Sequence, residues 1–161
     1  MRYVVDDDRD RIDADTVWEF LSQQAYWGRW RTRADVGQQL RGAWRLVGAY
    51  DESGAMVAFA RAVSDGVAVA YLADVFVLPE HRGAGIGDAV IRRMVDEGPG
   101  AHFRWMLHTA DAHGFYARHG FTRPDATYLE RPSTAVPSRS EPPDRAGDRS
   151  PAAGPGHHPA V

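Results

Sequence analysis

The sequence contains neither cysteine nor lysine, and all 19 of its basic side chains other than histidine are arginine. Without a thiol the chain can form no disulfide, bind no zinc through cysteine and carry no acyl group on a cysteine nucleophile. It also lacks any apolar run approaching the about 18 residues of a membrane span. Acidic residues follow directly on residues 1–5, which is unlike a signal peptide. We therefore expect a cytoplasmic protein without a membrane partner.

The charge balance lacks the basic excess that nucleic-acid binding normally requires. The net charge is −3, and because the charges after Arg131 sum to zero, residues 1–131 hold all of it. We therefore expect no nucleic-acid partner. Residues 132–161 contain seven prolines and few aliphatic side chains, which predicts a disordered tail behind one domain. Arginine interrupts the aspartates of residues 6–10, which favours a solvated turn there over a metal site.

The strongest functional signal is a glycine loop that follows an apolar strand and opens a helix. Arg82, Gly85 and Gly87 fit the pattern Gln/Arg-x-x-Gly-x-Gly/Ala. Such glycines let a ligand approach the backbone, and the N–H groups at a helix start attract an anion. The lysine of a nucleoside-triphosphate loop and the third glycine of a dinucleotide fingerprint are both missing. Two interpretations remain: a loop that holds the pyrophosphate of a coenzyme A, and a purely structural helix start.

A second motif lies downstream, where a strand over 103–109 leads into a short helix over 112–118 that ends at Gly120. Residues 115–121 read Phe-Tyr-Ala-Arg-His-Gly-Phe. This string resembles the second acetyl-CoA motif of the GNAT N-acetyltransferase superfamily, and the loop at 82–87 resembles its first. The resemblance covers roughly residues 1–131. Within the superfamily, strings at 26–27, 59–61, 74–77 and 109–114 are similar to a group of small bacterial acetyltransferases.

The order of predicted elements is strand, two helices, three strands, helix, strand, helix, strand, which indicates an α/β (α+β) fold. The resemblance implies a GNAT-like mixed, mainly antiparallel sheet of six to seven strands with about four helices around it. It also implies that the fourth and fifth strands splay apart. We expect strands near residues 2–5, 44–51, 55–64, 67–77, 103–109 and 127–131. We expect a first helix that is capped by Asp15 and runs to residue 23, and further helices over residues 32–41, 85–97 and 112–118.

The resemblance implies acetyl-CoA as co-substrate, no metal, and transfer of the acetyl group to a primary amine of a small molecule or peptide by direct attack. The pantetheine arm would lie between the splayed strands, beside main-chain groups of Phe76 and Val77. Arg82 and the backbone N–H groups after it would hold the pyrophosphate. The implied cofactor-binding residues are Phe76, Val77, Arg82, Gly83, Ala84, Gly85, Ile86, Gly87, Asp111, Tyr116 and Arg118.

Two side chains are candidates for the chemistry. Tyr116 could give a proton to the leaving thiolate, because a phenol has a pKa of about 10, close to that of a thiol; alternatively, it only packs. Asp74 could accept the amine proton or bind a cationic substrate, because a buried carboxylate is costly unless it is paired or used. A structural ion pair is the equal alternative. Several relatives carry a Glu slightly earlier on this strand, where this chain has Tyr71 or Leu72.

The acceptor wall is expected from the link between the first two helices, with Tyr26, Trp27 and Arg31 as candidates. Tyr71 and His108 are further substrate-binding candidates, although a histidine there could also be structural. Arg31 in the cleft would favour an amine that bears a carboxylate, whereas dominant Asp74 and Asp65 would favour a polyamine-like cation; the aromatic residues could instead close the core.

Function and assembly each leave an alternative. A domain that senses CoA or acyl-CoA and regulates a partner without turnover is the alternative to an enzyme. An interaction protein that uses its exposed tail is a third possibility, which no recognisable peptide motif in residues 132–161 supports. A homodimer is possible.

Overall fold

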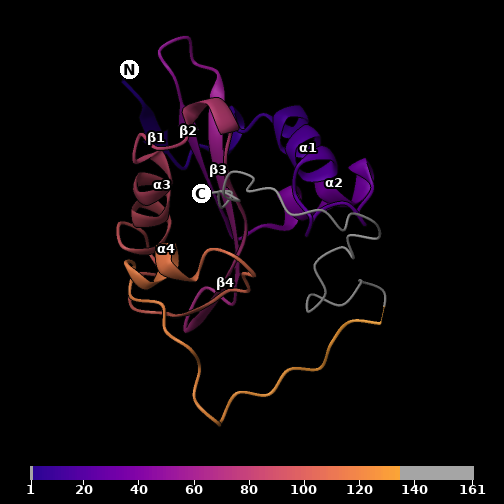
Figure 1. Cartoon of the computed structure of the whole chain (residues 1–161), viewed down its shortest axis with the longest axis vertical. Helices are drawn as coiled ribbons and strands as arrows, with labels where there is room; N and C mark the ends of the chain where they lie inside the picture. The colour runs from indigo at the N-terminus through magenta and orange to yellow at the C-terminus, as the bar shows by residue number, and fades with distance from the viewer. Residues whose placement is uncertain (1, 135–161) are drawn as a thin grey trace, which may run out of the picture.

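The computed structural model describes residues 2–134, so most of the predicted tail, residues 135–161, lies outside the described part of the chain (Figure 1). No helix among the described residues is long and apolar enough to cross a membrane. The elements are β1 (Val4–Asp6), the 3₁₀ helix η1 (Arg9–Arg11), α1 (Ala14–Gln23), α2 (Arg33–Gly42), β2 (Arg45–Tyr50), β3 (Met56–Ser64), β4 (Val69–Val77), the 3₁₀ helix η2 (Pro79–His81), α3 (Ile86–Val95), β5 (Arg104–Met106) and α4 (His113–Ala117).

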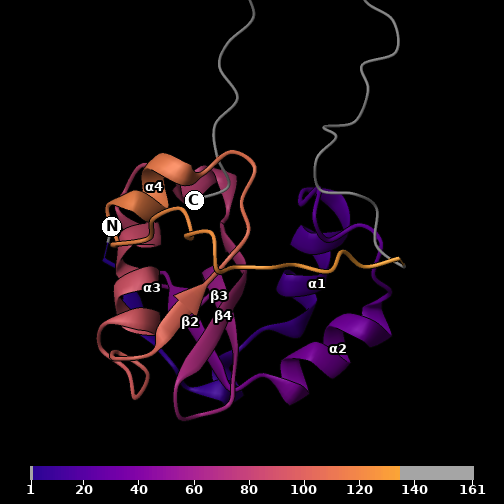
Figure 2. The ribbon, with the colours of Figure 1, turned by 90° about the horizontal axis from the view of Figure 1, so that it is seen from below.

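A five-stranded sheet in the order β1-β2-β3-β4-β5 forms the middle layer. Neighbouring strands are antiparallel from β1 to β4, and β5 is parallel to β4. Helices α3 and α4 cover one face of the sheet, and α1 and α2 cover the other (Figure 2). Each face has its own apolar cluster. We call the two faces of the sheet the α3/α4 face and the α1/α2 face. The mixed, mainly antiparallel α/β fold with four helices is thus confirmed.

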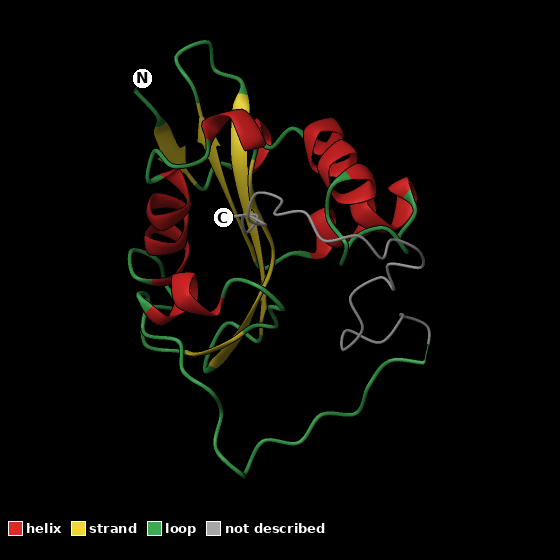
Figure 3. Ribbon diagram, in the orientation of Figure 1, coloured by secondary structure: helices red, strands yellow, loops and turns green. Residues whose placement is uncertain are grey.

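The predicted six to seven strands are not confirmed, because residues 127–131 form a loop without strand pairing in the described part of the chain (Figure 3). The side chain of Asp125 accepts hydrogen bonds from the backbone N–H of Thr127, at 2.9 Å, and from its hydroxyl. The backbone N–H of Tyr128 donates a hydrogen bond to the carbonyl oxygen of Asp125. A turn of this kind uses the N–H groups that a sheet ladder would need.

The helix starts follow capping chemistry. Thr32 and Asp35 form the predicted capping box at the start of α2, with each side chain accepting the other's backbone N–H. The predicted cap of α1 at Asp15 is wrong, because Asp13 has the extended backbone of a cap and accepts from the N–H groups of Asp15 and Thr16. Both aspartates suit a cap by residue type, and the backbone angles decide between them.

Strands β4 and β5 part after a short parallel segment. In the described part of the chain they pair only over Val69–Tyr71 and Arg104–Met106, while β4 continues to Val77 beside β3. The β3–β4 register shifts near Asp74, whose φ of 53° lies in the left-handed region; aspartate tolerates this region better than most residues. The parting that the resemblance implies is therefore present, and β4 beyond Tyr71 has no neighbour from β5.

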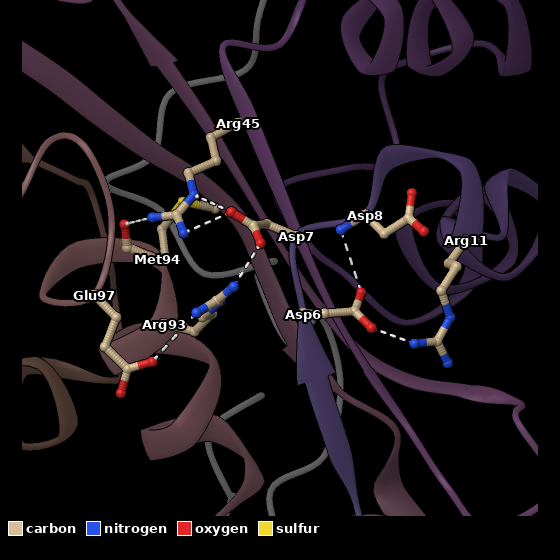
Figure 4. A network of polar contacts seen from close by, with 8 residues as sticks. All are labelled: Asp6, Asp7, Asp8, Arg11, Arg45, Arg93, Met94 and Glu97. Carbon is tan, nitrogen blue, oxygen red and sulfur yellow. Dashed lines mark hydrogen bonds and ion pairs between the residues drawn. The ribbon is translucent and has the colours of Figure 1, made fainter.

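Asp7 connects the N-terminal segment to β2 and α3 (Figure 4). Its carboxylate accepts hydrogen bonds from Nη2 of Arg45 and Nη2 of Arg93, each at 2.8 Å. Arg45 also donates to the carbonyl oxygen of Met94 at 2.7 Å, in the last turn of α3. The hydrogen bond from Arg45 is the main reason that the pKa of Asp7 lies below its usual range. Asp7 is therefore bonded within the fold and does not lie in the solvated turn predicted for residues 6–10. Among the described residues no group of His, Cys, Asp or Glu is arranged to hold a metal.

The close approach of Arg45 to Gly98 gives a stability prediction. A Cβ built on Gly98 would lie 1.6 Å from Nη1 of Arg45, so Gly98→Ala should displace this buried guanidinium from Met94 and Asp7. We expect the free energy of unfolding in urea to fall by about 1–3 kcal/mol, since buried charged partners lose their hydrogen bonds. Gly42→Ala is the control, because its added Cβ meets no atom within 4 Å. Equal losses in the two variants would contradict the proposed contact.

Candidate active site

The glycine loop between η2 and α3 has a backbone that only glycine adopts without strain at two positions. Gly83 has φ 77° and Gly85, the N-cap of α3, has φ 75°. The first N–H groups of α3 have no acceptor within the helix, because the ladder begins with the bond from the N–H of Ala89 to the carbonyl oxygen of Gly85. The loop therefore presents a row of donors at the positive end of a helix, the arrangement that binds phosphate groups elsewhere.

A cavity of about 330 Å³ lies against this loop. It brings together the end of β4, the loop, the first turn of α3 and the face of α4. Most of the predicted cofactor-binding residues line it, although they come from two motifs that are separate in the sequence. The lining residues are Val77, His81, Arg82, Gly83, Gly85, Ile86, Gly87, Asp88, Phe115 and Arg118.

Two arginines give the cavity its positive charge. Nε of Arg82 donates to the carbonyl oxygen of Val77 at 3.0 Å, which fixes the side chain beside the loop, and partial burial lowers the pKa of its guanidinium. Nη2 of Arg118 lies 3.3 Å from Oδ1 of Asp88, and Nε2 of His119 lies 2.9 Å from the same oxygen. Asp88 is the one acidic residue of the lining. The charge of Asp88 is therefore already balanced, and the charge of Arg82 is left for an anion.

Four predicted cofactor-binding residues do not line this cavity: Phe76, Ala84, Asp111 and Tyr116. The side chain of Phe76 stacks on Phe20 with ring centroids 4.1 Å apart, so the side chain belongs to the core of the α1/α2 face. Three lining residues were not predicted: His81, Asp88 and Phe115. His81 precedes Arg82, Asp88 lies in the first turn of α3, and Phe115 belongs to the second motif. These positions in the sequence could have indicated them.

Tyr116, in the second half of α4, is buried within the apolar cluster of the α3/α4 face. Burial raises the pKa of its hydroxyl, and the charge of Asp111 and the nearness of Tyr26 act in the same direction. A phenol held in its protonated form can donate a proton but is a poor base.

Asp74 is part of a buried ion-pair network on β4. Its two carboxylate oxygens accept from Nη1 and Nη2 of Arg31, at 2.9 and 2.8 Å, and from Nε of Arg61 at 2.8 Å. The side chains of Asp74 and Arg31 are 5% and 3% exposed. Burial alone would raise the pKa of Asp74, but the hydrogen bonds and charges of the two arginines outweigh it and lower the pKa. This geometry favours the structural alternative for Asp74.

The network also holds one of the predicted acceptor residues. The guanidinium of Arg31 is bonded to Asp74 and, at 2.7 Å, to the side-chain oxygen of Gln39. Trp27 packs against the cluster of the α1/α2 face. Asp65 accepts from the N–H groups of residues 67–69 and shapes the β3–β4 turn. Each of these three side chains has contacts within the protein, and a role toward an acceptor stays a prediction.

The other three predicted substrate-binding residues meet near the end of β5. The hydroxyl of Tyr26 accepts from the N–H of Ala110 at 3.2 Å, which links the α1–α2 connection to the chain after β5. The hydroxyl of Tyr71 lies 2.7 Å from Nδ1 of His108, and Nε2 of His108 lies 2.7 Å from Oε2 of Glu130. Sequence reasoning missed Glu130 and Arg61, because both act through partners far away in the sequence.

A second cavity of about 400 Å³ lies between α2 and β3, next to the connection between α1 and α2. Arg61 forms part of its wall and, through Nε, also contacts Asp74. The cavity has an aromatic ring, one carboxylate and two amides in its lining. Its residues are Trp30, Asp35, Gln38, Gln39, Gly42, Arg61 and Val63.

The glycine loop, the two arginines and the tyrosine helix match a known family in sequence as well. A family model described as an acetyltransferase (GNAT) domain matches residues 43–123. The chain belongs to the GNAT acetyltransferase family. A crystal structure of a candidate GNAT acetyltransferase from Xanthomonas campestris pv. campestris is 36% identical, with a TM-score of 0.77 over 84% of this chain and 96% of that one.

A more distant solved structure supports the fold, and a fungal protein is similar in sequence over part of the chain. Glucosamine-6-phosphate N-acetyltransferase from Arabidopsis thaliana shares the fold, with a TM-score of 0.58 and 14% identity over 81% of this chain and 99% of that one. A candidate acetyltransferase from Gibberella zeae is 34% identical over 47% of this chain, and the match spans only 41% of that fungal protein's length. Because one relative is fungal, a bacterial origin of this GNAT chain stays a prediction.

The buried network gives a second stability prediction for this GNAT domain. Asp74→Asn leaves two buried arginines without a counter-charge, so the free energy of unfolding should fall by roughly 3–5 kcal/mol. Asp96→Asn, at the exposed C-cap of α3, is the control and should change it by less than about 0.5 kcal/mol. Denaturant unfolding of both variants measures the difference. A loss in Asp74→Asn no larger than in the control would show that the arginines do not depend on this carboxylate.

The same network sets an acid dependence. The pKa of Asp74 in the folded protein lies below the ordinary value of 3.8, so its contribution to stability is present above about pH 4 and is lost as the pH falls through the folded value. Wild-type protein should therefore lose stability in acid with a steeper slope than Asp74→Asn. Parallel slopes in the two proteins would contradict the lowered pKa.

Proposed function

We propose that the chain is an acetyl-CoA-dependent N-acetyltransferase that moves an acetyl group to a primary amine of a small molecule or peptide, with Tyr116 as general acid. The observation that carries the proposal is the cavity that joins the glycine loop to Arg82 and Arg118. Acetyl-CoA is the implied co-substrate, and when bound it supplies an activated acyl group. The protein's part is to bind it, to orient it and to move protons.

The residues present fit such a ligand. The N–H groups of the loop and the charge of Arg82 suit a pyrophosphate, because they offer donors and positive charge without further rearrangement. Beyond Tyr71, main-chain groups of β4 around Phe76 and Val77 are not paired with β5 in the described part of the chain. They suit the amide groups of an extended arm in the way that an added strand would.

Tyr116 is proposed as the donor of the proton that the departing sulfur needs. Burial raises the pKa of its hydroxyl, so the proton is present to be given but is held more tightly than in a free phenol. The helix that carries Tyr116 also carries Phe115 and is followed by Arg118, both of which line the cavity. The helix that carries the proposed acid therefore also borders the proposed cofactor cavity.

The location, the assembly and the acceptor stay predictions: a cytoplasmic enzyme, a possible homodimer, and an acceptor that is a small molecule or peptide. The cavity bordered by Trp30 and Arg61 is the proposed place for the non-reacting part of the acceptor, because it adjoins the predicted acceptor wall.

Cofactor binding is tested by calorimetric titration with acetyl-CoA. Arg118→Ala should weaken binding by about fivefold or more, since a charge near the phosphates is lost. Arg92→Ala is a matched control: the side chains of Arg118 and Arg92 are 61% and 60% exposed, and each pairs with one carboxylate, but Arg92 lies outside the cavity lining. Absence of wild-type binding, or equal weakening in both variants, would overturn the assignment.

Turnover is tested by thiol release from acetyl-CoA across a panel of amines. Tyr116→Phe should lower kcat by about 10²-fold or more, the ordinary contribution of general acid catalysis, with little change in acetyl-CoA affinity. Tyr128→Phe, on an exposed tyrosine, should leave kcat unchanged. Wild-type kcat in Tyr116→Phe would end the acid role, and binding without turnover on any amine would favour the CoA-sensing alternative.

A further inference from the structure

Three side chains from three separate segments form a hydrogen-bonded chain where β4 and β5 part. Tyr71 is the last residue of β4 that pairs with β5. His108 follows the end of β5 by two residues, and Glu130 belongs to the loop after α4. The hydroxyl of Tyr71 lies 2.7 Å from Nδ1 of His108, and Nε2 of His108 lies 2.7 Å from Oε2 of Glu130.

The chemistry of the three groups fixes the direction of these hydrogen bonds. A carboxylate only accepts, so Nε2 of His108 must carry the hydrogen that Glu130 receives. In a neutral imidazole the other nitrogen, Nδ1, then has a lone pair and accepts from the hydroxyl of Tyr71. The carboxylate orients the ring and stabilises it if it gains a proton. This is the order of groups in which a histidine acts as a base in hydrolases.

We propose that Tyr71, His108 and Glu130 form a proton relay that deprotonates the acceptor amine, with Tyr71 as the catalytic residue and His108 and Glu130 acting through it. The oxygen of Tyr71 takes one proton from the acceptor ammonium while its own proton passes to Nδ1 of His108. A neutral amine and an imidazolium result, and no other bond forms or breaks. The imidazolium then returns its proton to water. The proposal rests on the N-acetyltransferase function proposed above.

The position of the relay matches the acceptor side of the proposed active site. Leu72 belongs to the cluster of the α3/α4 face, and side chains alternate along a strand, so Tyr71 faces the side of α1 and α2. Tyr26 reaches the same place, because its hydroxyl accepts from the N–H of Ala110, two residues after His108. Tyr116 comes from the opposite face. The proposed acid and base thus lie on the two sides of the gap between β4 and β5.

The relay is more exposed to water than Asp74, the buried carboxylate of β4. The side chains of His108 and Glu130 are 32% and 41% exposed, so a proton that arrives on the imidazole can leave to water. Asp74 is 5% exposed and both its oxygens are bonded to arginines. A contact as exposed as that between His108 and Glu130 contributes little to stability.

The test compares kcat/KM for an accepted amine between wild type and three variants over a range of pH. Tyr71→Phe and His108→Asn should lower the value by about 10²-fold at neutral pH, the usual contribution of a general base. Glu130→Gln keeps an acceptor for Nε2 but removes the charge, so a smaller decrease of about tenfold is expected. All three deficits should shrink as the pH rises and the amine loses its proton without help.

The controls separate the relay from a structural role. His102→Asn and Tyr128→Phe alter exposed residues outside the relay and should leave the pH profile unchanged. Acetyl-CoA affinity should stay within about twofold in the three relay variants, since none of these residues lines the loop cavity. Deficits that stay constant with pH, or that appear as lost acetyl-CoA affinity, would overturn the relay.

A measurement without turnover keeps the relay falsifiable on its own. Long-range ¹H–¹⁵N NMR spectra of the neutral imidazole of His108 should show the hydrogen on Nε2, and Tyr71→Phe should shift the signal of Nδ1. The opposite tautomer would overturn the relay even if the enzyme is active. Wild-type protein that binds acetyl-CoA, shows the Nε2–H tautomer and acetylates no amine would overturn the proposed function instead.

Discussion

The shared charge of Asp74 is the interaction on which the rest of the site depends. One carboxylate holds Arg61 of the neighbouring strand and Arg31 of the connection between α1 and α2. Its backbone adopts the left-handed region at the place where the β3–β4 register shifts. The network therefore joins the irregular part of β4 to β3 and to the connection between α1 and α2, and the single carboxylate offsets part of the cost of burying two arginines.

The two faces of the sheet divide the work of the proposed reaction. The α3/α4 face supplies the loop, the positive charge and the buried phenol of Tyr116, whereas the α1/α2 face supplies the cavity beside Arg61 and the hydroxyl of Tyr71. The proposed reaction would bring the two faces together where β4 and β5 part. A chain with these strands paired along their full length would leave no unpaired main-chain groups on β4 for an extended ligand arm.

Features with a local cause could be predicted from the sequence, and features with a distant cause could not. The loop at Gly83–Gly87 follows from glycines that permit positive φ, and the capping box follows from Thr32 and Asp35, three residues apart. Arg31 and Asp74 are 43 residues apart, and His108 and Glu130 are 22 apart, so no local pattern announces these pairs. The expected strand at 127–131 failed because Asp125 binds the N–H that a strand would have offered.

The short pairing of β4 with β5 also bears on how the protein behaves when nothing occupies the gap. A strand in the middle of a sheet then presents a row of unpaired amide groups, as the outer strand of an open sheet does. Such rows are templates for adding a strand from another molecule. An extended ligand arm that paired with these groups would therefore also cover an exposed strand edge.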